Sequence, residues 1–344
     1  MPLSVLAELG EVLARYGLTR ADGTEPRRAG TGFSGADVWQ VATSLGPLCV
    51  RRWPTEHPTP PGLRRIHDML RGAVAAGCRF LPAPLPALDG STVTQHQGRL
   101  WEVTPWMPGT PDDSPRIDEE RLACVWRALA AFHLASLQQG MFRNVLAAPR
   151  GPSPGIAERL QKLDYVTAVG LAEVRHAAVP LGWERLAMQR DEYTQLLGTA
   201  ARQVRPVLTA VATDHVEQAV CIRDIRREHV LFTDDEVTGW VDFGAMSLDS
   251  PAADAARVLG EFCDERRAEW ATLLAPYQHT CRGTLLESCS LHLVDAFDRS
   301  GTLLAPWNWL RWIFLEDRDF PDRDAVVRRF DQLLVRLRRM VETA

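Results

Sequence analysis

Lysine is nearly absent from this chain. Lys162 is the one lysine among 344 residues, so 38 of the 39 basic residues are arginines. A phosphate-binding loop of the Walker A type needs a lysine after its glycines, and no lysine stands in such a position. Any phosphate group that this chain binds would therefore have to be held mainly by arginine, whose planar guanidinium can hold two oxygens at once.

The sequence also lacks the patterns of disulfide-rich, zinc-binding and membrane proteins. Its seven cysteines are an odd number and include no CxxC pair, which argues against a disulfide framework and a zinc site. No apolar run reaches the length that spans a bilayer, and Met1 to Arg20 lacks the features of a signal peptide. We expect a cytoplasmic protein that does not bind membranes.

Length and charge suggest two domains and a small-molecule partner. A chain of 344 residues exceeds the usual single core, so two domains are expected. The net charge of -5 divides into 11 basic and 9 acidic residues up to position 107, and 28 and 35 beyond it. This distribution does not indicate a nucleic-acid partner. The acidic second part suggests a small hydroxylated, possibly cationic substrate, whereas nothing in the sequence indicates an oligomeric state.

The most informative stretch is Cys221 to Gly244, which places two aspartates around two short predicted strands. Asp224 follows an apolar run, and His229 stands five positions later. Residues 230–232 and 237–241 flank an acidic turn, and Asp242 closes the second strand before a glycine. Phosphoryl transfer needs one carboxylate near the attacking hydroxyl and another that holds a metal ion, and these two aspartates suit those roles.

A glycine-rich hairpin lies near the start of the chain. Gly30, Gly32, Ser34 and Gly35 precede an alternating strand at 38–41, and residues 48–52 form a second strand. Small residues at the tip would let backbone amides approach phosphate groups. A dinucleotide-binding loop would open a helix instead of a strand, so we exclude that fold.

Together these segments resemble the aminoglycoside phosphotransferase and choline kinase family, which has a protein-kinase-like fold. The resemblance rests on CIRDIRREHVLF, on VTGWVDFGAM and on the later helix start Asp254-Ala255-Ala256-Arg257. It implies an α+β protein with two lobes. A small antiparallel sheet lobe that binds nucleotide would cover residues 1–107, and a larger, mainly helical lobe with the catalytic loop would cover 108–344.

The same resemblance implies roles for individual residues. Asp224 would be the catalytic aspartate, Asp242 would bind Mg²⁺, and position 229 would be a further metal ligand. Arg51 would hold the nucleotide phosphates, while Arg52 points to the other face of its strand. Backbone groups near Glu102, Val103 and Thr104 would meet the purine edge, although the side chains of Trp101, Val103 and Trp106, each taken separately, better suit a plain core or interface.

Three positions depart from the family pattern. Ile222 replaces a histidine, and His229 replaces an asparagine. Because Mg²⁺ prefers oxygen ligands, His229 either binds the metal or hydrogen-bonds Asp224 or the loop backbone. The helix predicted at 62–76 contains no glutamate to pair with Arg51, so that ion pair is rebuilt with Asp68 or is absent.

Helical periodicity dominates after residue 110. Helices are predicted at 119–136, 183–204, 252–264, 266–274, 285–297, 306–314 and 323–341. Gly151 to Gly155 matches the hydrolase pattern GxSxG, but the prolines on both sides of Ser153 exclude the required strand turn.

The sequence thus predicts a phosphotransferase that moves the γ-phosphoryl group of ATP or GTP, with Mg²⁺, to a hydroxyl of a small molecule. The alternative is a catalytically weak, pseudokinase-like protein that binds nucleotide or a partner.

Overall fold

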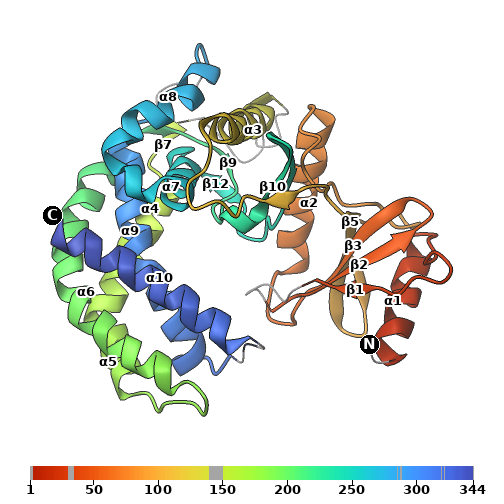
Figure 1. The fold of residues 1–344 in the computed structure, drawn as a ribbon, viewed down its shortest axis with the longest axis horizontal. Helices are drawn as coiled ribbons and strands as arrows, with labels where there is room; N and C mark the ends of the chain where they lie inside the picture. Colours follow the sequence, from red (N-terminus) through yellow and green to blue (C-terminus); the bar gives the residue numbers. More distant parts are fainter. Residues whose placement is uncertain are drawn as a thin grey trace.

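The chain forms the two predicted lobes. A computed structural model describes residues 3–29, 35–138, 150–284, 286, 289–318, 320 and 322–343. A small lobe built on an antiparallel sheet lies beside a larger, mainly helical lobe, and helix α2 lies between them (Figure 1). The predicted α+β class is confirmed.

The sheet of the small lobe has the strand order β1-β2-β3-β5-β4, and all neighbouring strands are antiparallel. The strands are β1 Arg27–Arg28, β2 Asp37–Thr43, β3 Gly46–Arg52, β4 Thr94–His96 and β5 Arg99–Pro105. Gly46 has a φ of +96°, which allows the tight turn between β2 and β3. The register places Arg51 opposite Val38 on one side and Glu102 on the other, in the middle of the sheet.

Two helices accompany this sheet. The sequence analysis did not predict α1, Leu3–Arg15, whose apolar residues share a buried core with the sheet residues Trp39 and Trp101. Helix α2, Pro60–Ala75, begins at Thr59, whose hydroxyl accepts a hydrogen bond from the N–H of Gly62. On the buried side of α2, Ile66, Leu70 and Ala73 belong to the core of the larger lobe, whereas Leu63 packs with Trp53 of the small lobe, so this helix links the two lobes.

Short strands in the larger lobe position the predicted catalytic loop, residues 222–229. Strand β10, Val230–Thr233, pairs with β11, Glu236–Trp240, which confirms the predicted hairpin. The other side of β10 pairs with β6, Thr110–Pro111, just after the chain crosses from the small lobe. The remaining strand pairs are β9 Ala219–Cys221 with β12 Ser247–Asp249, and β7 Arg150–Gly151 with β8 Val216–Glu217.

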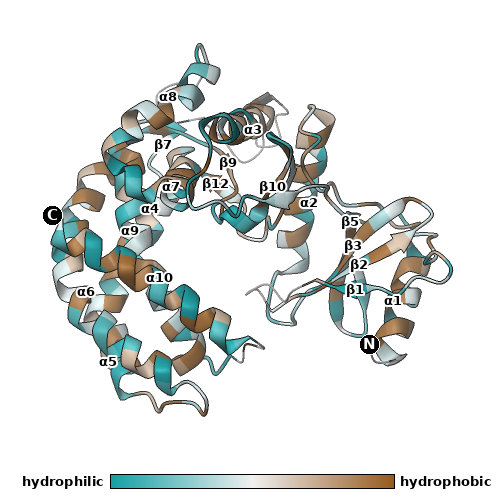
Figure 2. Ribbon diagram, in the orientation of Figure 1, coloured by the Kyte–Doolittle hydropathy of each residue, from teal (hydrophilic) through white to brown (hydrophobic). Residues whose placement is uncertain are grey.

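The larger lobe is mainly helical. Its helices are α3 Glu119–Gln138, α4 Pro154–Tyr165, α5 Leu171–His176, α6 Glu184–Val211, α7 Ala252–Phe262, α8 Trp270–Thr280, α9 Leu291–Leu310 and α10 Arg323–Glu342. Helices α6, α9 and α10 pack against one another (Figure 1). Hydrophobic and hydrophilic residues alternate along α6 and α10, as Figure 2 shows, so each helix turns one side to the core.

Two predicted helices have different boundaries in the structure. The helices predicted at 285–297 and 306–314 share one continuous helix, α9, which is followed by a wide π turn at Arg311–Leu315. Pro306 lies inside α9 and is buried between Leu303 and Leu310, so packing offsets its missing backbone donor. No helix in the described ranges is long and apolar enough to cross a membrane.

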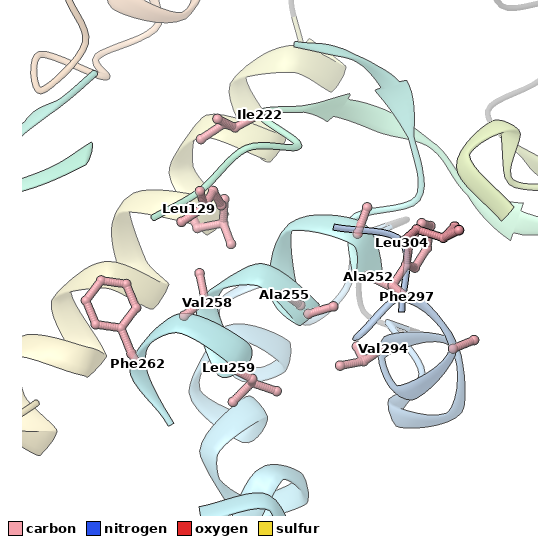
Figure 3. Close-up of a cluster of buried hydrophobic side chains, with 14 of the residues drawn as sticks. Leu129, Ile222, Ala252, Ala255, Val258, Leu259, Phe262, Val294, Phe297 and Leu304 are labelled. Carbon is pink, nitrogen blue, oxygen red and sulfur yellow. The ribbon is translucent and has the colours of Figure 1, made fainter. Parts of the chain in front are cut away.

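The central core surrounds the start of the catalytic loop. Ile222 is fully buried in the same core as Leu129 of α3, while Val294 and Phe297 of α9 pack near α7 (Figure 3). The family's histidine is therefore replaced by a core side chain at position 222. Burial of the Ile222 side chain helps to hold the backbone shortly before Asp224.

Candidate active site

A cavity of about 870 Å³ lies between the two lobes. The small lobe contributes Arg51, Trp53, Glu102 and Thr104 to its lining, and the larger lobe contributes Asp224, His229, Asp242 and Phe243. Most of the predicted site residues that the structure describes therefore face one space. Its volume suits a small molecule of nucleotide size.

The backbone of the catalytic loop is held by Asp254 at the start of α7. The fully buried Asp254 carboxylate accepts hydrogen bonds from the backbone N–H groups of Ile222 and Arg223, at 2.6 and 2.7 Å. Nε2 of His133 donates to the same carboxylate at 3.1 Å. Arg223 has a φ of +67°, an unfavourable conformation that these bonds maintain next to Asp224.

The Asp224 carboxylate stands between two arginines. Its Oδ1 lies 3.5 Å from Nε of Arg226 and 3.8 Å from a terminal nitrogen of Arg257. Burial on its own raises the pKa of Asp224, but the charges of Arg226 and Arg257 oppose burial, and the pKa is lowered. Asp224 is therefore ionised at neutral pH and can accept a proton or orient a hydroxyl.

His229 contacts both aspartates. Its Nδ1 lies 2.9 Å from the backbone carbonyl of Asp224, and a carbonyl only accepts, so Nδ1 carries the proton. In the neutral ring Nε2 is then unprotonated, and it lies 3.6 Å from a carboxylate oxygen of Asp242. The sequence analysis gave two alternatives for His229, metal binding or a hydrogen bond to Asp224 or the loop backbone. The two are compatible, because the hydrogen bond to the loop uses Nδ1 and leaves Nε2 free to bind a metal.

The residues around Asp242 fit a divalent cation. One ligand atom each from Asp224, His229 and Asp242 lies within 4.8 Å of the others. Two carboxylates and one imidazole suit Mn²⁺ and related ions as well as Mg²⁺. Asp242 has a φ of +66°, so its conformation, like that of Arg223, is one that few residues other than glycine adopt.

Arg51 has an acidic partner that the sequence analysis did not identify. Its Nε lies 3.5 Å from the Glu102 carboxylate, and a terminal nitrogen lies 3.9 Å from Asp242. The prediction that this pair is absent or rebuilt with Asp68 was wrong, because Asp68 is exposed and the partner comes from strand β5. Burial favours loss of the proton, but Glu102 and Asp242 outweigh it and raise the pKa of Arg51.

Helix α2 supports this ion pair through a histidine instead of a glutamate. Nε2 of His67 donates to the Glu102 carboxylate at 2.6 Å, and Nδ1 contacts the Thr92 hydroxyl at 2.9 Å. Burial on its own raises the pKa of Glu102. The hydrogen bond from His67 and the charge of Arg51 together outweigh burial, so the pKa is lowered. Glu102 therefore remains charged within the cavity wall.

The remaining small-lobe predictions divide between the cavity and the core. Thr104 lines the cavity, together with Trp106 and Met107. Val103 instead points into the core of the small lobe, and its carbonyl accepts a hydrogen bond from the N–H of Leu85 at 2.8 Å. Its contact with a purine stays a prediction. Gly35, with a φ of +74°, precedes β2, whereas Gly30, Gly32 and Ser34 lie outside the described residues.

The arginines near Asp224 differ in what they contact. Arg226 lies at the site and lines the cavity, whereas Arg227 donates to the backbone carbonyls of Glu261 and Ser114 and holds the loop. Arg257 was missed as a site residue, although it lies in the quoted segment at the start of α7. Only the folded chain shows that this helix turn faces Asp224.

Ser153 has a structural role. It caps α4 by accepting a hydrogen bond from the N–H of Ile156, and its hydroxyl donates to Asp249 at 2.6 Å. It is buried at a helix start, so the exclusion of a hydrolase elbow is confirmed.

A two-lobe fold with an acidic cluster facing a buried arginine across one cavity defines the class of kinase-like phosphotransferases. The model of the phosphotransferase enzyme family matches residues 25–285, and the chain belongs to this family. A comparison with curated protein sequences gives no match.

Several solved structures share the fold at low sequence identity. Spectinomycin phosphotransferase, solved with ADP and spectinomycin, has a TM-score of 0.70 at 10% identity, over 94% of this chain and 92% of that chain. A microcompartment-associated aminopropanol kinase has a TM-score of 0.63 at 15% identity, over 96% and 95%. Amicoumacin kinase, solved with AMP-PNP and Ca²⁺, has a TM-score of 0.62 at 13% identity, also over 96% and 95%.

Proposed function

We propose that this protein transfers the γ-phosphoryl group of ATP or GTP to a hydroxyl group of a small molecule. The observation that carries the proposal is the convergence of Asp224, His229 and Asp242 opposite Arg51 in the cavity between the lobes. Neighbouring folds solved with ADP and AMP-PNP support a nucleotide as the phosphoryl donor.

Each side chain of the site has its own role in the transfer. Asp224, kept ionised by Arg226 and Arg257, orients the acceptor hydroxyl and takes its proton. Arg51 binds phosphate oxygens, while Glu102 holds its side chain in place. Asp242 and His229 would hold a divalent cation, which when bound neutralises charge on the phosphate oxygens.

Packing around the cavity limits the access of water. Phe243 follows Asp242 and packs against Phe132 of α3, with ring centroids 6.3 Å apart. Trp53 lies over Arg51, with the guanidinium carbon 4.9 Å from the ring centroid. Charges in such a partly enclosed site interact more strongly than in water, which favours stabilisation of the transition state.

The alternative of a pseudokinase-like binding protein rests first on two replacements, His229 in place of asparagine and Arg51 in place of lysine. A second argument for it, an Arg51 without an acidic partner, does not hold in the structure because Glu102 supplies that partner. His229 also leaves one nitrogen for a metal. We therefore favour the active enzyme.

A panel of hydroxylated compounds tests the proposal. Purified protein is incubated with each compound, Mg²⁺ or Mn²⁺, and ATP or GTP, and products are detected by mass spectrometry. We expect at least one product that is heavier than its acceptor by one phosphoryl group. Metal-dependent nucleotide binding with no product from any acceptor would instead support the pseudokinase-like alternative.

A further inference from the structure

A second cavity adjoins the first on the other side of Asp224. It has a volume of about 450 Å³ and is lined by α4, α7, α9 and α10 as well as by the catalytic loop. Asp224, Arg226, Ala245 and Trp312 line both cavities. A hydroxyl group at the inner end of the second cavity would meet Asp224, so this cavity is the place for the acceptor.

The charges in this second cavity are mainly positive. Its lining includes two carboxylates, Glu158 and Asp224, and six cations. The cations are Arg159, Lys162, Arg223, Arg226, Arg257 and Arg329. The sequence expectation of a possibly cationic substrate rested on the net charge of the whole lobe, and the local charge of the cavity favours the opposite sign.

Four of these cations already have acidic partners. Arg223 contacts Glu158 and lies 3.7 Å from Asp249, and Arg329 lies 2.9 Å from Glu261. Arg226 and Arg257 both contact Asp224. These side chains are therefore at least partly neutralised within the protein.

Arg159 and Lys162 differ from the other four. Among the carboxylates that the structure describes, none lies within 4 Å of either side chain. Arg159 lies over the ring of Phe297, 4.5 Å from its centroid, and donates to the carbonyl of Gly155 at 3.1 Å. Lys162 donates to the side-chain oxygen of Asn308 on α9. Both cations lie three positions apart on α4 and reach the same cavity.

Burial, and to a smaller extent the neighbouring cations, lowers the pKa of both side chains. Burial, with the neighbouring cations Arg257 and Arg223, lowers the pKa of Arg159 to about 10, although Asp249 opposes the shift. Burial, with Arg311 and Arg159, lowers the pKa of Lys162 to about 8. An anion bound between them would offset this repulsion and raise both pKa values.

We propose that the acceptor is a hydroxylated anion whose carboxylate or phosphate group binds Arg159 and Lys162 on α4 and so presents a hydroxyl to Asp224. The inference rests on the proposed function, and it specifies the charge of the acceptor. Leu304, Trp309 and Trp312 provide an apolar wall in the same cavity, so the remainder of the acceptor has a carbon skeleton or ring that packs there.

Lysine-selective labelling tests anion binding without any turnover. Because the chain contains one lysine, ¹³C labelling at Cε gives a single side-chain NMR signal, that of Lys162. The protein is saturated with ADP and Mg²⁺ to fill the nucleotide site and is then titrated from pH 6 to 11 with and without inorganic phosphate. We expect the Lys162 midpoint to rise by about one pH unit or more with phosphate.

Variants distinguish an anion site from a general salt effect. Arg159→Gln retains the lysine signal and should remove most of the change caused by phosphate. Arg185→Gln serves as the control, because Arg185 is largely exposed on α6 and pairs with Asp331 outside both cavities. Sodium chloride at equal ionic strength should not reproduce the shift.

Acceptor charge is then tested by turnover. Matched sets of hydroxy acids, sugar phosphates, neutral polyols and amino alcohols are compared as acceptors, and the first two sets separate carboxylate from phosphate recognition. We expect products among the anionic compounds. Lys162→Gln and Arg159→Gln should raise the KM for the acceptor about tenfold or more, with little change in the KM for the nucleotide.

Two results would overturn the inference while leaving the proposed function intact. One is efficient phosphorylation of neutral or cationic acceptors with no effect of Lys162→Gln. The other is a Lys162 midpoint unchanged by phosphate and by every acceptor that is phosphorylated. Anion binding at Lys162 with no transfer to any acceptor would refute the proposed function and retain the anion site.

Discussion

At the residue scale, the electrostatic balance of the small lobe depends on Glu102. The sequence analysis predicted that backbone groups near Glu102 meet the purine edge. The structure shows that the Glu102 carboxylate lies between Arg51 and His67. Spacing along the chain could not reveal this, because the three residues come from separate elements that meet only in the folded lobe. Position 51 itself was predicted from the family resemblance, and the alternation of strand β3 served only to set Arg52 aside.

Removing the Glu102 carboxylate should destabilise the protein. Glu102→Ala leaves the buried Arg51 and His67 without their shared partner, so we expect a loss of about 3 kcal/mol in the free energy of unfolding. Urea denaturation measures this loss. Asp68→Asn is the control, since an exposed side chain on α2 should change stability by less than about 0.5 kcal/mol. Equal effects of the two substitutions would contradict the ion pair.

His229 should determine the metal preference of the site. Imidazole suits Mn²⁺ better than Mg²⁺, so His229→Asn should shift the preference towards Mg²⁺. We expect the ratio of nucleotide affinity with Mg²⁺ to that with Mn²⁺ to rise about tenfold, as measured by calorimetry. His215→Asn, at an exposed position, should not change it. An unchanged ratio in His229→Asn would limit His229 to its hydrogen bond with Asp224.

At the scale of elements, helix α7 holds the catalytic loop. The sequence predicted α7 and the β10 to β11 hairpin because both have clear periodicity. It did not predict α1 or α4, and it divided α9 at Pro306, because burial by other elements overrides local signals at these places. Arg159 and Lys162 were not predicted as site residues, because α4, the helix that carries them, was not predicted.

Asp254 is the contact through which α7 acts. Asp254→Asn replaces an acceptor of two backbone N–H bonds by a side chain with one oxygen, inside a fully buried site. We expect the free energy of unfolding to fall by about 3 kcal/mol. The control is Asp295→Asn, which breaks partly exposed ion pairs and should cost less than about 1 kcal/mol. Similar losses in both variants would show that Asp254 does not anchor the loop.

At the scale of the whole molecule, the two lobes and their order along the chain were predictable, but the character of the acceptor site was not. The net charge of residues 108–344 is an average over a large surface. The second cavity gathers a few cations from α4, α7, α10 and the catalytic loop, and only their tertiary arrangement shows that they share one space. Composition suggested a possibly cationic substrate, whereas the acceptor that we propose is an anion.

The central claim is that Asp224 promotes phosphoryl transfer between the nucleotide and an acceptor bound across the two cavities. The most direct measurement is the rate of acceptor phosphorylation by the wild-type protein and by Asp224→Asn, with the same nucleotide and metal. We predict that the substitution lowers kcat by a factor of about 10² to 10⁴, with nearly unchanged nucleotide affinity. Equal rates in the two proteins would contradict the account.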